Sequence, residues 1–282
     1  MRNAIITACN KRYGEFLIRC WLKSLLAKTD TTNISIIVLD YGLTNDQVKA
    51  LRYNNITVVK ERKDGAIVTI RLRDTAKLLK REKFGKVLLC DGGDILFQED
   101  ISPIFERSDT QVAGVADDYY VAFERRFPAS TFSVPYSQIK KVMRNKKSVN
   151  AGFLTGPSEK MAWICETAYS MIKNKKIYGP DQVVIPFLLY SYGFRKLNRT
   201  YNFIPAMSKK RFYIENSEFY FMNKKKIKVV HNTGGISAFR IIKKFGYGPG
   251  CNMLDTINYA IQKNIYRGLD LIYSRKLDII SK

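Results

Sequence analysis

Short apolar runs recur along the first third of the chain. Runs rich in Ile, Val and Leu occur at 2–9, 33–42, 56–61 and 86–90, and polar or glycine residues bound each of them. Apolar runs of this length between turn residues are typical of buried strands. The pattern therefore predicts four strands in this part of the chain.

The segments between these runs carry helical signals. In EFLIRCWLKSLLAK (15–28), apolar residues recur at spacings of three and four residues. NDQVKALRY (45–53) follows a Thr-containing cap, and TIRLRDTAKLLKREKF (69–84) has the composition of a basic helix. Strands that alternate with helices are typical of a parallel sheet covered by helices. We therefore expect an α/β fold with a Rossmann-like, mixed but mostly parallel sheet.

The second half of the chain is less regular. TQVAGVADD (110–118) predicts a fifth short strand ending in acidic residues, and MAWICETAYSMIKNKK (161–176) predicts a helix. The basic, aromatic stretch 120–148 is expected to form loops over an active-site face. The composition becomes more basic near residue 206, which predicts a catalytic domain at 1–206 and a small, basic, helical C-terminal segment at 207–282.

The strand at 86–90 runs directly into Asp91, Gly92, Gly93 and Asp94. Aspartate and glycine are common turn formers, so a simple turn is one interpretation. A divalent metal site is the other, because open α/β sheets bind ligands at the carboxyl ends of their strands. Carboxylates three residues apart on a strand face opposite sides. A metal site therefore predicts a bulge in which Gly92 and Gly93 adopt positive φ angles.

His231 is the only histidine of the chain, and it follows a short apolar run. A lone histidine is commonly structural. At a strand end beside a glycine-rich loop, however, it can complete a metal site begun by two carboxylates. Oxygen ligands with one imidazole favour Mn²⁺ or Mg²⁺ over zinc. Gly234 and Gly235 follow, and their amides can approach a phosphate closely.

Two further motifs admit both structural and chemical interpretations. Asp181 and Gln182 open an apolar segment, either as a helix cap or as a carboxylate and amide placed beneath a reacting sugar carbon. Asn150 and Ala151 precede Gly152, either as an ordinary turn or as small residues against which a ligand lies.

The chain carries 48 Lys and Arg against 25 Asp and Glu, a formal net charge of +23. Such a protein is attracted to anionic partners, and nucleic acid, anionic membrane surfaces and phosphorylated substrates all fit. Lysine-rich codon usage would produce the same charge without a function. No zinc finger, RNA-recognition signature or helix-turn-helix is recognisable, so no nucleic-acid partner is expected.

Several features predict a cytoplasmic protein. The five cysteines include no C-x-x-C pair, which favours reduced thiols over disulfides or a zinc site. The N-terminal apolar run is too short for a signal peptide, and no run approaches the roughly 18 apolar residues of a membrane span. Residues 240–282 mix cations with aliphatic and aromatic residues. They predict either packed helices or a peripheral contact with the anionic inner face of the plasma membrane.

Taken together, the motifs resemble glycosyltransferase family 8, a group of retaining GT-A enzymes that includes glycogenin and lipopolysaccharide galactosyl- and glucosyltransferases. The matching segments, in family order, are AIITACNKRYGEFL, ISIIVLDYGLT, KVLLCDGGDILFQEDISPIF, VNAGFLTGP, the DQ pair, YNFIPA and VVHNTGG. The resemblance implies a GT-A fold and a metal-dependent retaining transfer of a hexose. UDP-glucose or UDP-galactose is the expected donor, and a saccharide or glycolipid of lipopolysaccharide or surface glycan is the expected acceptor.

The resemblance also implies roles on the nucleotide side. Tyr13 would stack on the uracil, and Thr7, Ala8 and Asn10 would line the pocket for base and ribose. In the family pattern, Asp94 and His231 would hold the metal, with Asp91 as a further metal ligand or a ribose contact.

On the sugar side, the resemblance implies that Asn150, Ala151 and Asp181 hold the donor hexose. Gln182 would lie near the anomeric carbon. Gly234 would contact the diphosphate, and Asp117 would face the acceptor.

The chain departs from the family at its phosphate-binding residues. The lysine-proline-tryptophan run that commonly follows the histidine is replaced by GGISAFR, which moves the expected phosphate contact to Arg240 or Lys243. In the basic helix, Arg73 is the expected cation beside the diphosphate. The metal aspartates are separated by two residues, where the family usually has one.

Two other classes of protein remain as alternatives. A basic nucleic-acid-binding protein is consistent with the net charge. A nucleotidyltransferase on a similar sheet would need a glycine-rich basic loop near the N-terminus, and TACNKRYG is a poor match for one.

Overall fold

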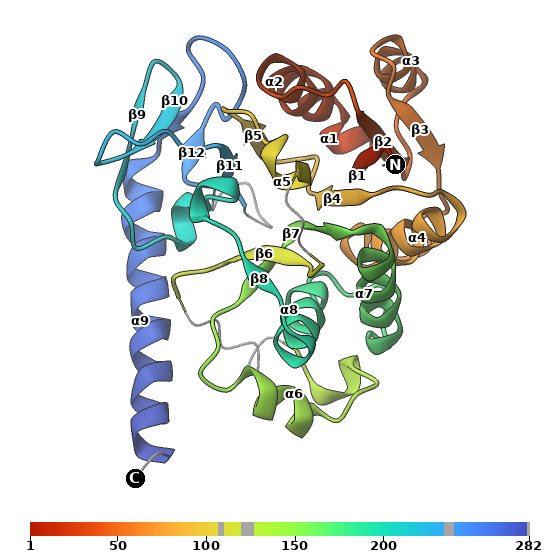
Figure 1. The fold of residues 1–282 in the computed structure, drawn as a ribbon. Coiled ribbons are helices and arrows are strands. Elements are labelled where there is room, and N and C mark those ends of the chain that lie inside the picture. Colours follow the sequence, from red (N-terminus) through yellow and green to blue (C-terminus); the bar gives the residue numbers. More distant parts are fainter. Residues whose placement is uncertain (107–109, 120–126, 234–239, 281–282) are drawn as a thin grey trace.

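The structure is a computed structural model that describes residues 1–106, 110–119, 127–233 and 240–280. Within these residues, a seven-stranded sheet forms the centre of the molecule in the order β3-β2-β1-β4-β7-β6-β8 (Figure 1). Its strands are β1 (Asn3–Cys9), β2 (Ile34–Asp40), β3 (Thr57–Lys60), β4 (Lys86–Cys90), β6 (Ala113–Ala116), β7 (Val149–Pro157) and β8 (Arg195–Lys196). Only β7 runs antiparallel to its neighbours among these strands.

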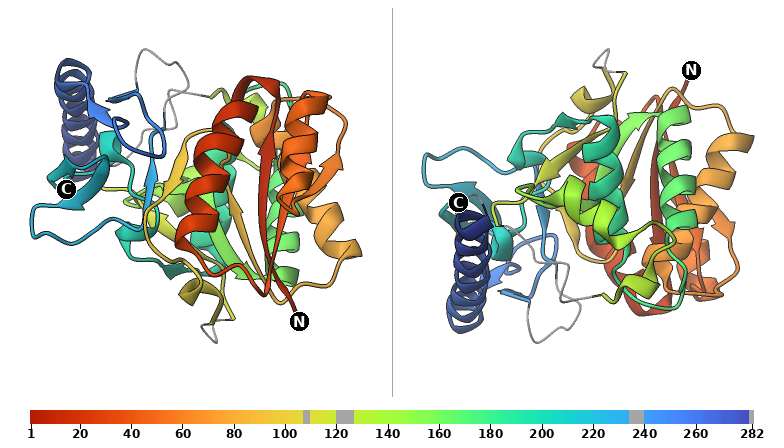
Figure 2. Two further views of the ribbon diagram at one scale, coloured as in Figure 1. Left: turned by 90° about the horizontal axis from the view of Figure 1, so that it is seen from above. Right: turned by 90° about the horizontal axis from the view of Figure 1, so that it is seen from below.

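Helices cover both faces of this sheet, as Figure 2 shows. One face carries α1 (Lys11–Phe16), the π-helical turn Leu17–Leu22, α2 (Lys23–Lys28), α3 (Asn45–Tyr53) and α5 (Pro103–Glu106). The other carries α4 (Ile67–Arg81), α6 (Tyr136–Met143), α7 (Ser158–Met171) and α8 (Asp181–Tyr192).

The strand residues divide between two hydrophobic cores because neighbouring side chains of a strand point to opposite faces. In β1, Ala4 and Ile6 join the core beneath α4 and α7, whereas Ile5 joins the core beneath the N-terminal helix. Both faces are therefore buried, as the continuous apolar runs of the sequence predict.

A third, smaller core lies beside the sheet. It is built by β9 (Phe212–Glu215), β10 (Glu218–Phe221), β11 (Val229–His231), β12 (Ile242–Lys243), β13 (Met253–Leu254) and α9 (Thr256–Ile280). Short 3-10 turns complete the described elements at Ala129–Thr131, Arg199–Tyr201 and Pro205–Met207. β11 pairs antiparallel with β5 (Ile95–Phe97), and α9 runs along one side of the molecule (Figure 1).

The α/β fold with a mixed, mostly parallel sheet is confirmed. The N-terminal helix begins at Lys11, earlier than predicted, because Asn10 caps it by accepting a hydrogen bond from the Arg12 amide. The division at residue 206 stays a prediction; residue 206 lies inside the 3-10 turn Pro205–Met207. Along the described residues, no helix has the length and apolar character needed to cross a membrane.

Candidate functional site

The two aspartates of the DGGD segment lie at the end of β4, and main-chain hydrogen bonds hold both in place. The Asp91 amide donates to the Gly152 carbonyl at 3.0 Å, which ties the start of the loop to β7. At the other end, the Asp94 carbonyl accepts a hydrogen bond of 2.9 Å from the Asn232 amide. The loop is therefore fixed to two other strands of the fold.

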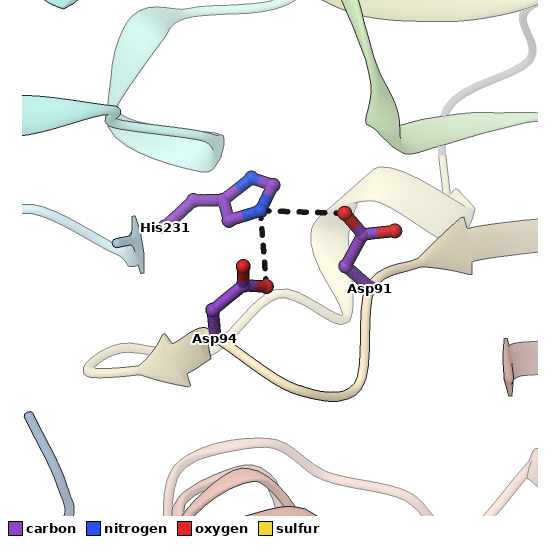
Figure 3. A group of neighbouring side chains, drawn as sticks. All are labelled: Asp91, Asp94 and His231. Carbon is purple, nitrogen blue, oxygen red and sulfur yellow. Dashed lines mark ion pairs between the residues drawn. The ribbon is translucent and has the colours of Figure 1, made fainter. Parts of the chain in front are cut away.

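His231 brings its imidazole to these carboxylates because β11 pairs with β5, and residue 231 stands opposite Ile95. Its Nε2 atom lies 3.4 Å from Oδ2 of Asp91 and 3.2 Å from Oδ1 of Asp94 (Figure 3). One ligand atom from each of the three residues lies within 4.8 Å of the others. The three residues that the sequence grouped as candidate metal ligands, Asp91, Asp94 and His231, therefore lie next to one another.

Electrostatics at this triad favour charged groups. Burial lowers the pKa of His231, but Asp94 and Asp91 outweigh it and raise that pKa to about 9. Burial likewise opposes ionisation of Asp91, yet Arg71 and His231 hold its pKa well below the ordinary range. The imidazole thus faces both carboxylates, and the opposite charges stabilise one another when the imidazole is protonated.

The glycines of the loop do not have the expected conformation. Among the described residues, the glycines with positive φ do not include Gly92 or Gly93. Their role is close packing: a Cβ atom at Gly92 would stand 2.6 Å from Oγ1 of Thr7, and one at Gly93 would stand 3.0 Å from the ring of Tyr13. The expectation of positive φ angles in a bulge at Gly92 and Gly93 is wrong. Glycine stands at both positions because a Cβ atom would lie too close to Thr7 or Tyr13.

Gly152 closes the Asn-Ala-Gly motif, for which the sequence left open an ordinary turn or a ligand contact. A Cβ atom there would lie 2.5 Å from Oδ2 of Asp91, 2.7 Å from Cε1 of His231 and 2.8 Å from Oδ1 of Asn150. No side chain fits in that space without moving the triad. The structure thus gives Gly152 a packing role that neither interpretation contained.

Arg71, not Arg73, is the arginine of α4 that reaches the triad. Arg71 is 3% exposed, forms an ion pair with Asp91, and places Nη2 at 3.8 Å from Oδ2 of Asp181. Arg73 instead pairs with Asp64 and Asp74. Residues two apart on a helix lie on different sides of it, so only one of them can face the sheet.

The helix pattern alone does not distinguish the two arginines, because each directly follows a buried apolar residue. Arg71 stands four residues after Ile67 and one after Ile70, on the side of α4 that packs against the sheet. A cation in that position needs a buried carboxylate partner. Arg73 likewise follows an apolar residue, Leu72, and stands three residues after Ile70, so the choice between the two depends on which side of α4 faces the sheet.

The residues expected to hold the donor sugar lie together. The Ala151 amide donates to Oε1 of Gln182 at 3.2 Å, and Nε2 of Gln182 donates to Oδ2 of Asp181 at 3.3 Å. Nη2 of Arg71 donates to the Ala151 carbonyl at 3.4 Å. Burial raises the pKa of Asp181 to about 6, although Arg71 opposes the shift. Oδ1 of Asp181 is buried without a hydrogen-bond partner.

The N-terminal residues of the candidate site surround Tyr13. Arg12 and Arg240 place their guanidinium carbons 5.3 and 5.9 Å from the centre of the Tyr13 ring. Nη2 of Arg240 also lies 3.6 Å from Oδ2 of Asp94, whereas Lys243 pairs with Asp255. Of the two cations proposed as substitutes at the phosphates, Arg240 is the one near the triad.

The remaining predicted positions lie in different surroundings. Oγ1 of Thr7 is buried without a hydrogen-bond partner, and Ala8 is half-buried at the end of β1. Asn10 serves as the helix cap described above, and Gly234 lies outside the described residues. Asp117 follows β6; burial raises its pKa to about 7, although Arg199 opposes the shift.

A separate cavity of about 510 Å³ lies between Lys28, the turn joining β9 to β10, and the loop Gly246–Gly250. None of the predicted site residues lines it. The candidate site is therefore defined by its convergent side chains and not by this hollow.

The architecture is that of GT-A-like glycosyltransferases. A crystal structure of the galactosyltransferase LgtC, in complex with donor and acceptor sugar analogues, aligns with a TM-score of 0.52 and 18% identity over 82% of this chain and 87% of that one. An active-site mutant of LgtC aligns with a TM-score of 0.55 and 18% identity over 93% and 95%. No protein-family model matches the chain, and no curated protein matches its sequence. At this identity, the likeness establishes the fold.

Proposed function

We propose that this protein is a metal-dependent retaining glycosyltransferase. It transfers a hexose from a nucleotide sugar, UDP-glucose or UDP-galactose, to a saccharide acceptor of lipopolysaccharide or another surface glycan. One observation carries the proposal: Arg71 joins the triad, through Asp91, to the pair formed by Asp181 and Gln182. A charged triad and the Asp181–Gln182 pair thus share one site in a fold similar to that of a solved galactosyltransferase.

The triad fits a divalent cation. Nε2 of His231 is buried without a hydrogen-bond partner, although it lies 3.4 and 3.2 Å from oxygens of Asp91 and Asp94. An unsatisfied imidazole nitrogen between two carboxylates is costly unless something binds there. Oxygen ligands plus one imidazole suit Mn²⁺ or Mg²⁺. When bound, the cation would supply positive charge at the donor diphosphate as the glycosidic bond breaks.

The chain's own residues would divide the remaining work at the diphosphate. Asp91, Asp94 and His231 would hold the cation. Arg240, beside Asp94, would contact the phosphates and favour departure of the nucleoside diphosphate. Gly234 is also proposed as a phosphate contact.

Arg71 lies beneath the site and holds Asp91 and Asp181 at fixed positions. On the nucleotide side, Tyr13 would stack on the base between two guanidinium groups, with Thr7, Ala8 and Asn10 beside it. These assignments stay proposals that rest on proximity and on the motif resemblance.

The sugar would lie against Ala151, whose amide is already bound by Gln182. Asn150 and Asp181 would orient its hydroxyl groups, and the Gln182 amide would face the anomeric carbon. Asp117 would meet the acceptor. Retention by a covalent intermediate and retention by front-face attack both fit these positions.

A thermal-shift panel of UDP-, GDP-, CMP- and dTDP-sugars, with and without Mn²⁺, tests this proposal. The true donor should raise the unfolding midpoint only with metal present, because a ligand that binds the native state stabilises it by mass action. Asp94→Ala and His231→Ala should abolish the metal-dependent shift. Asp64→Ala, which removes a carboxylate paired with the other arginine of α4, should retain it.

Other outcomes of the same panel would favour a different class. Absence of any nucleotide-sugar shift, together with DNA binding that weakens steeply with salt, would identify a nucleic-acid-binding protein. Release of inorganic diphosphate, in place of a nucleoside diphosphate, would identify a nucleotidyltransferase.

We also propose a cytoplasmic protein that contacts the inner face of the plasma membrane. The net charge of +23 would favour anionic lipids, and α9 exposes several aliphatic side chains. A lipid-linked acceptor would make such contact useful for catalysis.

A further inference from the structure

Asn202 lies on the side of His231 opposite the two aspartates. Its Oδ1 atom is 3.0 Å from Nδ1 of the imidazole, whereas Nε2 faces the carboxylates. Asn202 and His231 are 2% and 0% exposed, so water does not compete for this contact. The side-chain amide of Asn202 donates to Oδ1 of Asn150 at 3.2 Å.

The direction of these hydrogen bonds is set by a main-chain amide. The Gly152 N–H donates to Oδ1 of Asn150 at 2.9 Å. Because a backbone N–H can only donate, the Asn150 atom facing it must be oxygen. The Asn202 atom facing that oxygen must then be the NH₂ group, and the Asn202 oxygen must face the imidazole.

An amide oxygen only accepts hydrogen bonds, so the imidazole nitrogen beside it must carry a hydrogen. In the neutral ring, this places the hydrogen on Nδ1 and leaves a lone pair on Nε2, the atom that faces Asp91 and Asp94. In the metal-free ring the carboxylates of Asp91 and Asp94 attract a hydrogen on Nε2, whereas the Asn202 oxygen requires one on Nδ1, so the two sides compete for the single hydrogen.

We infer that Asn202 is a positioning residue, which holds neutral His231 as the Nδ1–H tautomer so that Nε2 is free to bind a divalent cation. The inference rests on the proposed metal site. Asn202 does not touch the metal position itself; it acts through the ring of His231. Residues that bind the second nitrogen of a metal-ligating histidine typically change metal affinity by about 10- to 100-fold when removed.

The main chain supports the same arrangement. The His231 amide donates to the carbonyl of Phe203 at 2.9 Å, directly after Asn202. β11 and the segment that follows the 3-10 turn Arg199–Tyr201 are therefore joined by their backbones as well as by the side-chain contact. This fixes the distance between the Asn202 oxygen and the imidazole.

A nitrogen NMR measurement tests the tautomer without metal, substrate or activity. His231 is the only histidine, so ¹⁵N-histidine labelling gives one imidazole with two nitrogen signals. The pH is raised until the two shifts stop changing, so that the ring is neutral, and the shifts then report which nitrogen carries the hydrogen. The inference requires Nδ1–H. A wild-type protein with Nε2–H as the main neutral form would overturn it.

Mn²⁺ titration of the metal-free protein, followed by calorimetry, tests the effect on binding. Asn202→Leu removes the acceptor and should raise the Kd by about 10- to 100-fold. Asn202→Asp keeps an acceptor beside Nδ1 but loses the donor to Asn150, so it should keep the Nδ1–H tautomer and recover part of the affinity. Asn198→Ala is the matched control. Asn198 lies in the same segment, but its side-chain oxygen accepts hydrogen bonds from the amide and hydroxyl of Thr200 and not from the site.

The two proposals fail in different ways. If the wild-type protein binds no Mn²⁺ or Mg²⁺, the metal-dependent function is refuted, while the tautomer of His231 is still decided by NMR. If the wild type binds metal and Asn202→Leu binds it within twofold with an unchanged tautomer, the positioning role is refuted and the proposed function stands. Should Asn202→Leu fail to fold, the wild-type tautomer and the Asn202→Asp variant decide the question.

Discussion

Arg71 and Asp91 form an ion pair between the buried face of α4 and the carboxyl end of β4. The guanidinium also approaches Asp181, so one cation serves two carboxylates. Arg71→Met would leave both carboxylates near the core without their partner. Removing one member of a buried pair commonly destabilises a protein by about 3–5 kcal/mol.

Urea denaturation measures this loss directly. Arg81→Met is the control, since Arg81 lies on the same helix in an exposed pair with Glu82 and should change the free energy of unfolding by less than about 0.5 kcal/mol. Equal effects of the two substitutions would contradict the role given to Arg71.

The positions of the triad residues could be anticipated because Asp91 and His231 each follow an apolar run and Asp94 stands three residues after Asp91. Asp91 and His231 stand at the ends of strands, and strand ends are visible as changes from apolar to polar residues. The order of α/β elements follows from the same periodicity. Local patterns thus carry most of the fold and the metal-binding candidates.

Other features depend on contacts that no local pattern contains. The choice of Arg71 over Arg73 depends on which side of α4 faces the sheet. Asn202 meets His231 across 29 residues of sequence, and Gly92 is required by the approach of Thr7. The spacing of the aspartates predicted positive φ angles at Gly92. Glycine is required there because a Cβ atom would lie too close to Thr7.

Gly152→Ala should impair metal binding, although the substitution adds only one methyl group. The added methyl group would meet Asp91 and His231 at 2.5 and 2.7 Å, so at least one ligand must move. We expect at least about a tenfold weaker Mn²⁺ affinity, in the range found when ligand positioning is lost. Calorimetric titration gives the value.

The control for this variant is Gly268→Ala in α9, where an added Cβ meets nothing within 4 Å. Alanine is a better helix former than glycine, so this variant should retain metal affinity and match or exceed wild-type stability. If Gly152→Ala binds Mn²⁺ with unchanged affinity, a methyl group fits beside the triad and the packing role given to Gly152 is refuted.

Asp117→Asn should change the pH dependence of stability. Burial raises the pKa of Asp117 from 3.8 to about 7 in the folded chain. Between these values the folded state binds more protons than the unfolded state, so the contribution of Asp117 to stability falls as pH rises. The asparagine variant does not titrate and does not lose stability in this way. Its free energy of unfolding relative to the wild type should rise from a small difference at about pH 4 to at most about 4 kcal/mol at pH 8.

Denaturation of the metal-free protein across this pH range measures the difference. The neighbouring Asp118→Asn provides a control of opposite sign. Asp118 has a lowered pKa because Arg199, Ser208 and the Lys209 amide outweigh its burial, so its stabilising contribution is present at neutral pH and lost as pH falls. If the stability of both variants changed with pH in the same direction, the opposite pKa shifts given to Asp117 and Asp118 would be contradicted.

The outward side of α9 carries Ile257, Ile261 and Ile265 at four-residue spacing, with 72, 47 and 51% of their surface exposed. Deletion of 240–282 would be a poor test of membrane contact, because it would remove Ile241 and other members of the third core. Substitutions on the exposed side leave that core intact and isolate the surface.

The combined substitution of Ile257, Ile261 and Ile265 by serine should reduce recovery with anionic liposomes in flotation by at least about tenfold. Each buried aliphatic side chain contributes on the order of 1.5–3 kcal/mol, so three partly inserted ones dominate the apolar part of binding. Tyr53→Ser, on α3 and 90% exposed, controls for loss of an apolar surface residue elsewhere. Wild-type flotation should weaken with salt, because lipid charge contributes. Equal recovery of the triple variant and the wild type would exclude this side of α9 as the membrane contact.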